Sequence, residues 1–260
     1  MARADVELVA RGLAPSRSAA QRLIADGAVF AAPGERVARP AQPVAPHERL
    51  WVESSDETRF VSRAGAKLMH ALHDTGLDPR GQTVLDAGMS TGGFTDCLLQ
   101  AGASRVIGIE VGFGQLHPRL RDDPRVTCLE RTHLRDLTPE RLAACVPDLP
   151  RDGMPMAVAD LSFISLTKVL PALDALLAPD APALLLVKPQ FEAGPAALDA
   201  RGVVARAADR ERAVDTVAAA CGALGWRLEG RHPSALPGGD GNRETFLLAR
   251  TARRRPSPPT

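Results

Sequence analysis

From about residue 60 onward, short apolar runs alternate with longer segments in which apolar residues recur every three or four positions. Such runs are typical of strands buried on both faces, and the intervening periodicity is typical of helices that cover them. The alternation predicts an α/β fold with a doubly wound, largely parallel sheet. The predicted strands are Thr83–Asp86, Arg105–Val111, Val126–Glu130, Met156–Leu161, Ala183–Val187, Trp226–Gly230 and Thr245–Ala249, and the predicted helices span 64–74, 92–102, 167–177 and 207–224.

The first 30 residues predict two short helices and a strand. Ser16 is placed to cap the second helix, because a serine hydroxyl can accept a hydrogen bond from the first helical turn. The second helix is expected to end at Asp26-Gly27. The apolar positions of the two helices are Val6, Val9 and Leu13 in the first and Ala19, Ala20, Leu23 and Ile24 in the second.

The rest of the N-terminal region lacks such periodicity. Residues 31–50 are rich in proline and predict irregular structure with a turn at Pro33-Gly34, and the polar stretch Glu53–Thr58 is expected to be a linker. We therefore predict a small α+β domain with its linker over residues 1–58 and an α/β domain over 59–251. The basic, proline-rich tail 252–260 is expected to be disordered.

The composition of the 260 residues, 45% apolar and 24% charged, is that of a globular protein. No apolar run is long enough to span a membrane, and the N-terminus lacks the apolar core of a signal peptide, so a cytoplasmic protein is expected. The four cysteines are widely spaced, which favours neither disulfides nor a metal site. A net charge of +1 means that any RNA-binding surface must be local.

Lysine is rare in this chain. Of the 32 basic residues only three are lysines: Lys67, Lys168 and Lys188. A lysine can lose its proton in suitable surroundings, whereas an arginine in a protein cannot. Lysines that fall within motifs are therefore candidates for proton chemistry, and chance remains the alternative for any one of them.

A glycine-rich turn connects a predicted strand to a predicted helix. A dinucleotide site would have the spacing G-x-G-x-x-G, so that the backbone can approach a pyrophosphate. Here Gly88, Gly92 and Gly93 are spaced G-x-x-x-G-G, and Asp86 precedes the turn. A carboxylate is unfavourable beside a pyrophosphate and favourable near a sulfonium and an ammonium. The pattern therefore favours S-adenosylmethionine, and a tight turn without a ligand is the alternative.

The next predicted strand ends in Glu110, which suits hydrogen bonds to ribose hydroxyls in either cofactor. The cofactor residues predicted from these two strand ends are Asp86, Gly88, Ser90, Thr91, Gly92, Gly93, Phe94, Glu110 and Val111.

Four polar segments lie at or beside the ends of predicted strands, where doubly wound sheets bind their ligands. A charged residue that emerges from a buried apolar run, as Asp160 and Lys188 do, is costly unless it is paired or functional. Lys188 is predicted to remove the proton of a ribose 2′-hydroxyl, with Asp160 holding it in place. Lys67 and Glu244 are predicted to orient the sugar. The segments are Ser62–Lys67, Ala159–Phe163, Leu186–Glu192 and Gly241–Phe246.

Each of these residues also has an ordinary structural explanation. Asp160 could cap a helix, and Lys188 could form a lone structural ion pair. Lys67 could be a solvated helix residue, and Glu244 could be a surface acid at the start of an edge strand.

Several ordered segments together resemble the TlyA (hemolysin A-like) family of ribosomal RNA 2′-O-methyltransferases, whose catalytic domain is similar to the FtsJ type. The resemblance covers nearly the whole chain, including an Arg-x-Trp-Val segment at Arg49–Val52. The matching segments are Ser62–Lys67, Asp86–Thr95, Gly112–Leu116, Glu130–Thr132, Ala159–Leu166, Lys188–Glu192 and Gly241–Phe246.

The resemblance implies a class I, Rossmann-like methyltransferase sheet that binds S-adenosylmethionine. It implies methylation of a cytidine ribose in 23S rRNA, either alone or together with 16S rRNA, with the rRNA bound within ribosomal subunits. It also implies the catalytic set Lys67, Asp160, Lys188 and Glu244, and further cofactor contacts from Glu130, Arg131, Thr132 and Asp160. The family's activity is associated with susceptibility to cyclic peptide antibiotics.

The N-terminal region resembles an RNA-binding domain of the kind found in ribosomal protein S-four, which identifies candidate RNA contacts. They are Arg3, Arg11, Ser16, Arg17, Arg22 and Arg63. We expect the protein to act as a monomer and without a membrane.

Three residues depart from the family pattern. Met89 adds bulk after the first glycine of the turn, His133 replaces an asparagine, and Phe113 replaces a tyrosine. Two other functional classes stay open on the sequence: a Rossmann-fold enzyme that acts on a small molecule, with or without a nicotinamide cofactor, and a membrane-active hemolysin. No basic amphipathic helix favours the hemolysin.

Overall fold

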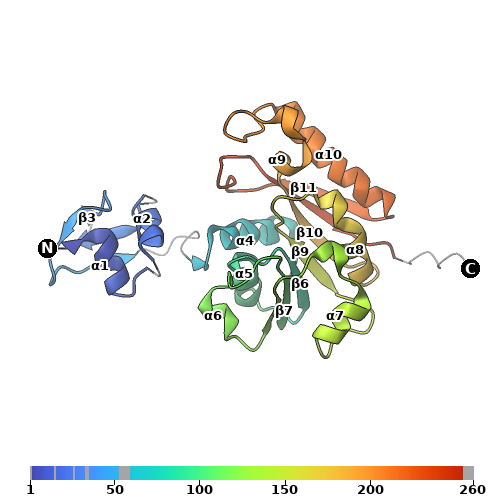
Figure 1. The fold of residues 1–260 in the computed structure, drawn as a ribbon, viewed down its shortest axis with the longest axis horizontal. Helices are drawn as coiled ribbons and strands as arrows, with labels where there is room; N and C mark the ends of the chain where they lie inside the picture. Colours follow the sequence, from blue (N-terminus) through green and yellow to red (C-terminus); the bar gives the residue numbers. More distant parts are fainter. Residues whose placement is uncertain (1, 15, 26, 33–34, 53–58, 254–260) are drawn as a thin grey trace, which may run out of the picture. The chain divides into compact units, whose positions relative to one another are not determined.

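The chain forms two compact units, Met1–Arg59 and Phe60–Thr260. The structure, a computed structural model, describes residues 2–14, 16–25, 27–32, 35–52 and 59–253 (Figure 1). The predicted turn at Pro33-Gly34, the linker Glu53–Thr58 and the tail beyond residue 253 lie outside the described residues.

The N-terminal unit packs two helices, α1 (Ala4–Ala10) and α2 (Arg17–Ala25), on short strands. The Ser16 hydroxyl caps α2 as predicted, accepting a hydrogen bond of 3.2 Å from the backbone N–H of Ala19. The expectation of irregular structure over 31–50 is wrong in part, because short strands form there. The strands are β1 (Ala2–Arg3), β2 (Val29–Ala32), β3 (Glu35–Arg36), β4 (Pro43–Val44) and β5 (Trp51–Val52), paired as β1-β4 and β3-β2-β5.

These strands form because their apolar residues complete a core that the two helices cannot close alone. Leu8 of α1 and Ile24 of α2 are buried against Val29, Val37 and Leu50. Val44 of β4 lies within the stretch whose prolines favour irregular structure and is fully buried in the same core, so burial outweighs the local sequence preference there.

The larger unit contains a seven-stranded sheet in the order β11-β12-β10-β9-β6-β7-β8 (Figure 1). All neighbours are parallel except β12, which is antiparallel to both β10 and β11. The predicted α/β, Rossmann-like sheet is confirmed. The strands are β6 (Thr83–Ala87), β7 (Arg105–Ile109), β8 (Val126–Leu129), β9 (Met156–Ala159), β10 (Pro182–Val187), β11 (Arg227–Pro233) and β12 (Thr245–Arg250).

Helices cover both faces of this sheet (Figure 1). The four predicted helices form, and the short helices α6, α7 and α9 and the 3-10 turns were not predicted. The helices are α4 (Arg63–Thr75), α5 (Gly93–Gln100), α6 (Pro118–Arg121), α7 (Pro139–Cys145), α8 (Leu170–Leu176), α9 (Pro189–Glu192) and α10 (Ala207–Ala223), and the 3-10 turns are η1 (Leu134–Asp136), η2 (Leu166–Lys168) and η3 (Pro195–Ala197).

The two faces of the sheet carry separate apolar cores, since successive side chains of a strand point to opposite faces. In β6, Val84 packs in the core that includes Leu68 of α4 and Leu98 of α5. Its neighbour Leu85 packs in the core that includes residues of α7, α8 and α10. Burial on both faces explains why central strands such as β6 and β10 are nearly continuous apolar runs, whereas the exposed edge strand β11 is not.

The strand order reverses between β6 and β9, which creates the crevice where open α/β sheets bind ligands. The chain leaves β6 toward β7 and β8, and later crosses to β9 and β10 on the other side. The backbone N–H of Asp160, just after β9, donates to the carbonyl of Ala87 at the end of β6, at 2.9 Å. The loops that follow β6 and β9 therefore begin side by side.

Helices α4 and α5 make their closest contact through two glycines. A Cβ on Gly65 would lie 2.8 Å from the carbonyl oxygen of Gly93 and 2.4 Å from side-chain atoms of Phe60. Because this contact fixes the first turns of both helices, it determines where Lys67, two residues further along α4, projects. Among the described residues, no helix is both long enough and apolar enough to cross a membrane.

We expect Gly65→Ala to lower the melting temperature, since overpacking a tight contact costs about 1–3 kcal/mol. Gly222→Ala in α10 is the matched control, because a Cβ there meets nothing within 4 Å. Alanine favours helix more than glycine does, so the control should be neutral or slightly stabilising. Thermal unfolding followed by circular dichroism checks both, and equal melting temperatures would contradict the role of the Gly65 contact.

Candidate active site

The glycine-rich turn after β6 passes too close to the neighbouring loop to carry a side chain at its first position. Gly88 has φ of +89°, a conformation that glycine adopts without strain. A Cβ there would lie 2.6 Å from the carbonyl oxygen of Asp160. Glycine is therefore required for the loops after β6 and β9 to converge.

Asp86 lies fully buried beneath this turn. Its Oδ2 accepts a hydrogen bond of 2.6 Å from the Thr95 hydroxyl. Its Oδ1 has no hydrogen-bond partner among the described residues. Burial raises the pKa of Asp86 to about 7; the Thr95 hydrogen bond opposes this rise, and the charges of Asp160 and Glu110 add to it.

Glu110 follows β7 and connects the turn to the next loop. Its carboxylate accepts hydrogen bonds from the backbone N–H of Ser90 at 2.8 Å and of Gly112 at 2.6 Å. The carboxylate is nearly buried. Its Oε1 also accepts a hydrogen bond of 3.5 Å from the Gln115 side-chain amide, so Oε2 is the oxygen that retains a lone pair for a ligand hydroxyl.

A small pocket of about 130 Å³ lies over the glycine-rich turn. Its lining includes the predicted residues Gly88, Ser90, Thr91, Gly93, Phe94 and Asp160, together with Ser62, Ala64, Met89, Ser162 and Lys188. Of the other predicted cofactor residues, Asp86 lies buried below the turn, and Gly92 caps α5 with φ of +94°. Phe94 is itself largely part of the core, where it stacks on Phe246 with ring centroids 6.1 Å apart.

The remaining predicted cofactor residues lie beyond this pocket, after β7 and β8. Val111 is exposed. Glu130 accepts a hydrogen bond of 2.7 Å from the backbone N–H of Gly114, and the Thr132 hydroxyl donates to the carbonyl of Glu130 at 3.0 Å. The Arg131 guanidinium lies 4.2 Å from the ring centroid of Phe113.

The acidic residues of this region suit a cationic ligand. Asp86 lies near the end of β6, Glu110 and Asp160 directly follow β7 and β9 on its two sides, and the buried Oδ1 of Asp86 lacks a partner among the described residues. A pyrophosphate would be repelled by this arrangement, whereas a cofactor with an ammonium and a sulfonium would be attracted. The residues present therefore fit S-adenosylmethionine.

The four predicted catalytic residues come together as two ion pairs. The Lys67 ammonium contacts the Glu244 carboxylate, and both side chains are buried. Lys188 Nζ lies 2.7 Å from Asp160 Oδ1 and donates a hydrogen bond of 2.8 Å to the Ser162 hydroxyl. Asp160 Oδ1 accepts no aligned hydrogen bond among the described residues, so the contact is an ion pair.

Glu244 is buried and is not a surface acid at the start of an edge strand. Glu244 precedes β12, which lies between β10 and β11 and is not an edge strand. Burial raises the pKa of Glu244, whereas the nearby Lys67 and Lys188 charges oppose the rise and the Asp160 charge adds to it. Lys67, Glu244 and Lys188 line one pocket, so the two ion pairs are neighbours.

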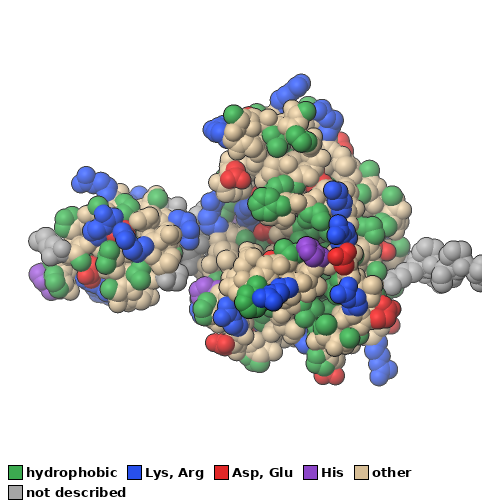
Figure 2. Space-filling model, in the orientation of Figure 1, with side chains coloured by type: hydrophobic (Ala, Val, Ile, Leu, Met, Phe, Trp, Pro, Cys, Tyr) green, Lys and Arg blue, Asp and Glu red, His purple; other side chains and the backbone are tan. Residues whose placement is uncertain are grey.

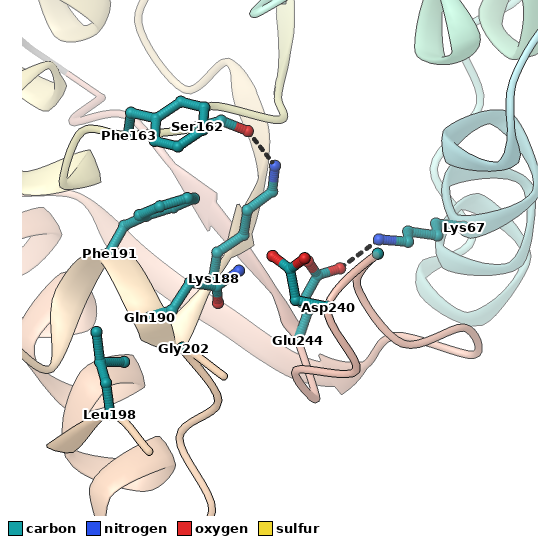
Figure 3. A pocket seen from close by; sticks show the side chains of 11 residues that line it. Lys67, Ser162, Phe163, Lys188, Gln190, Phe191, Leu198, Gly202, Asp240 and Glu244 are labelled. Atoms are coloured by element: carbon teal, nitrogen blue, oxygen red, sulfur yellow. Dashed lines mark hydrogen bonds and ion pairs between the residues drawn. The ribbon is translucent and has the colours of Figure 1, made fainter. Parts of the chain in front are cut away.

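A second pocket of about 330 Å³ adjoins the first (Figure 3). Lys67 and Glu244 face it from one side and Phe163 and Phe191 from another. Ser162 and Lys188 line both pockets, so the Lys188 ammonium lies on their common wall. The arrangement can therefore hold a cationic ligand on one side of Lys188 and a second substrate on the other.

Several residues of the second pocket were not predicted as site residues. Most of them lie in or beside the four polar segments, whereas Leu198 and Gly202 lie outside them. Ser162 fixes the Lys188 ammonium, and Phe163 is almost fully exposed with ring centroid 5.3 Å from that of Phe191. The signal for them was their proximity in sequence to Asp160 and Lys188. Gln190 and Asp240 complete the polar lining.

Met89 is accommodated by a glycine on the neighbouring strand. A Cβ on Gly108 of β7 would lie 2.0 Å from the terminal methyl group of Met89. The Met89 side chain is buried and packs in the core around Val106. Most of its bulk is therefore taken up beneath the turn. His133 is exposed and precedes η1.

The candidate RNA contacts differ in how available they are. Arg3, Arg17 and Arg22 are exposed, and Figure 2 shows several basic side chains on the visible face of the N-terminal unit. Arg11 is engaged within the unit, where it pairs with Glu7 at 2.7 Å and donates to the carbonyl of Ala45 at 3.2 Å. Ser16 is exposed and caps α2. Arg63 begins α4 in the larger unit and donates to the carbonyl of Pro237 at 3.4 Å.

Comparison with known proteins identifies relatives over most of the chain. Residues 60–251 match the model of the FtsJ-like methyltransferase family. The 16S/23S rRNA (cytidine-2′-O)-methyltransferase TlyA of Mycobacterium tuberculosis is 46% identical over 250 residues, which cover 96% of this chain and 90% of the relative.

Two solved structures extend the comparison. One from Streptococcus thermophilus that carries a hemolysin name is 34% identical, covers 97% of this chain and 89% of its own, and has a TM-score of 0.74. An S-adenosylmethionine-dependent methyltransferase from Mesorhizobium loti has a TM-score of 0.52 at 18% identity, covering 72% of this chain and 99% of its own, and shares the fold.

The raised pKa of Asp86 predicts that cofactor binding releases a proton near neutral pH. An aspartate in an unfolded chain has a pKa of about 3.9, so the folded protein without ligand holds an extra proton between that value and about 7. This contribution to stability is fully present below the unfolded pKa and is lost as the pH rises through 7. A cationic ligand favours the ionised carboxylate, so S-adenosylmethionine should bind more tightly at pH 8 than at pH 6.

Calorimetric titration in buffers of different ionisation enthalpy measures this proton release. Asp86→Asn should abolish it, together with the corresponding loss of thermal stability between pH 6 and pH 8. Thr95→Val should move the transition to higher pH, because the Thr95 hydroxyl stabilises the ionised carboxylate. A wild-type affinity that does not change between pH 6 and pH 8 would contradict the titration of Asp86.

Proposed function

The chain belongs to the TlyA branch of the FtsJ-like methyltransferase family, and on this basis we propose that it transfers a methyl group from S-adenosylmethionine to a cytidine ribose 2′-hydroxyl in ribosomal RNA. The substrate is 23S rRNA, either alone or with 16S rRNA, bound within ribosomal subunits. The observation that carries this proposal is the position of Lys188 on the wall shared by the two pockets.

Lys188 is the residue that handles the proton. S-adenosylmethionine, when bound over the glycine-rich turn, supplies an electrophilic methyl group. The donor would give this methyl group to the ribose oxygen, with its sulfur as the leaving group, and Lys188 in its amine form would take the hydroxyl proton. Asp160, 2.7 Å from Nζ, stabilises the resulting ammonium. The Ser162 hydroxyl keeps Nζ directed at the boundary between the pockets.

Lys67 and Glu244 orient the ribose. Both are buried and paired, and both line the larger pocket. A lysine ammonium donates hydrogen bonds and a carboxylate accepts them. Together they can therefore bind neighbouring hydroxyls of a sugar, each of which can donate and accept. Because α4 and the loop before β12 hold them rigidly, the ribose can be aligned with little loss of entropy on approach to the transition state.

The N-terminal unit provides the wider RNA contact. Its exposed arginines can bind phosphates without reading sequence. We propose that Arg3, Arg17 and Arg22 contact RNA phosphates, with Arg11 and Ser16 holding the unit's structure beside them, and that Arg63 contributes from the catalytic unit. The protein is proposed to act as a monomer in the cytoplasm.

We expect Lys188→Ala to reduce methyl transfer to ribosomal subunits by at least about a hundredfold, the scale of a lost general base. Binding of S-adenosylhomocysteine should change little. Lys168→Ala is the matched control, since Lys168 is exposed and lines neither pocket, and should keep wild-type activity. Mass mapping of methylated ribose in subunits treated with wild type and variants measures both. Lys188→Ala activity within threefold of wild type would contradict the assignment, and labelling of a small molecule in place of RNA would replace the proposed substrate.

Charge reversal on α2 should weaken RNA binding specifically. Arg22→Glu is expected to lower the affinity for a 20-base-pair RNA duplex and to decrease the slope of log affinity against log salt by about one, as expected for one lost phosphate contact. Arg151→Glu, an exposed position of the catalytic unit, is the control. Equal affinities for both variants in fluorescence anisotropy would mean that α2 does not face RNA.

A further inference from the structure

One acidic residue of the N-terminal unit is buried among its basic residues. Asp5 lies in α1 and is fully buried, although its partners are largely exposed. Arg3 donates to both carboxylate oxygens, from Nε to Oδ1 at 2.9 Å and from Nη2 to Oδ2 at 3.0 Å. Arg17 of α2 donates to Oδ2 at 3.2 Å, and Gln21, one turn further along α2, donates to the same oxygen at 3.0 Å.

These contacts leave most of each guanidinium free for another anion. A guanidinium has five N–H donors in a rigid plane. Arg3 uses two of them on Asp5, and Arg17 uses one. The side chains of Arg3 and Arg17 remain 48% and 59% exposed, so their other donors face solvent from one place on the unit.

Asp5 is ionised under all ordinary conditions. The Arg3 guanidinium holds the pKa of Asp5 well below its usual range, and burial opposes this effect without overcoming it. The carboxylate therefore fixes two long side chains that would otherwise sample many rotamers, and ordering such side chains before binding removes an entropic cost of complex formation.

We propose that Asp5 is a positioning residue for RNA binding, which holds the Arg3 and Arg17 guanidiniums together as a preformed site for backbone phosphate. This inference rests on the proposed RNA-binding role of the N-terminal unit. It makes a prediction opposite to that of simple charge counting. Removal of a negative charge from an RNA-binding surface should strengthen binding, whereas loss of a positioning carboxylate should weaken it.

The same helix offers a matched control. Glu7 of α1 also pairs with an arginine, Arg11, but that guanidinium is additionally held by the carbonyls of Ala45 and Glu48. Arg11 thus keeps its place without Glu7. Glu7→Gln removes the same unit of charge, two residues from Asp5, without releasing an exposed arginine.

The test uses the full chain and a fluorescein-labelled 20-base-pair RNA duplex, titrated at several salt concentrations. Asp5→Asn should bind the duplex about three to ten times more weakly than wild type, as expected for the loss of a charge-assisted contact. Glu7→Gln should bind equally or up to about twofold more tightly, because it only removes a negative charge. Asp5→Glu, which keeps the charge and shifts the carboxylate by one methylene, should also weaken binding.

Two further measurements separate positioning from a purely structural role. Thermal unfolding and circular dichroism establish whether each variant is folded. If Asp5→Asn does not fold, the RNA affinity of Asp5→Glu still tests the proposal. In an Arg3→Gln/Arg17→Gln background, Asp5→Asn should no longer weaken binding, since it acts through these two arginines. An equal effect of Asp5→Asn in both backgrounds would overturn the proposal.

The outcome is independent of the catalytic test. Wild-type or tighter RNA binding by folded Asp5→Asn, with methyl transfer to ribosomal subunits intact, overturns this inference alone. Absence of methyl transfer by the unaltered chain contradicts the proposed function instead. Weak binding by Asp5→Asn with normal binding by Glu7→Gln supports the positioning role.

Discussion

The site depends on the close approach of two loops, the one that follows β6 and the one that follows β9. The backbone hydrogen bond from Asp160 to Ala87, 2.9 Å long, fastens the loops together, and Gly88 has no side chain to push them apart. From this contact Asp160 faces the glycine-rich turn on one side and Lys188 on the other. A single junction therefore sets both the floor of the smaller pocket and the ion pair on its wall. Any side chain at position 88 would push the glycine-rich turn away from the loop that carries Asp160.

Much of this arrangement could be predicted because strands buried on both faces are recognisable in the sequence as apolar runs. The strands from β6 to β10 are apolar runs, and the polar residues that follow them stand out against those runs. Since parallel strands end at one edge of a sheet, Asp86, Asp160 and Lys188 could be expected to meet there. The N-terminal strands do not form such apolar runs. Strands β1 to β5 are two to four residues long and lie among prolines and polar residues. Their buried residues Val29 and Val44 belong to a core that they share with both helices.

Other features depend on compensation between residues that are far apart in sequence. Met89 adds bulk beside the turn, and only the fold shows that Gly108 on the neighbouring strand makes room for it. Glu244 is compatible with a surface position until the antiparallel strand β12 is placed between β10 and β11. In the sequence, Asp5 is a negative charge that offsets the positive charge of nearby arginines, which would be expected to weaken RNA binding. In the folded unit it is buried and holds two of them, and on this basis we propose the opposite effect on RNA binding.

The structure gives a physical reason why lysine is favoured over arginine at two positions of this chain. Two of the three lysines, Lys67 and Lys188, line the larger pocket, and the third is exposed. An arginine at position 67 would bring a planar guanidinium into a buried site that holds a compact ammonium against Glu244. An arginine at position 188 could form the ion pair with Asp160 but could not take a proton from a hydroxyl, because guanidinium stays charged in proteins. In a chain whose cationic side chains are nearly all arginines, lysine therefore occupies the position to which the proposed mechanism assigns the proton transfer.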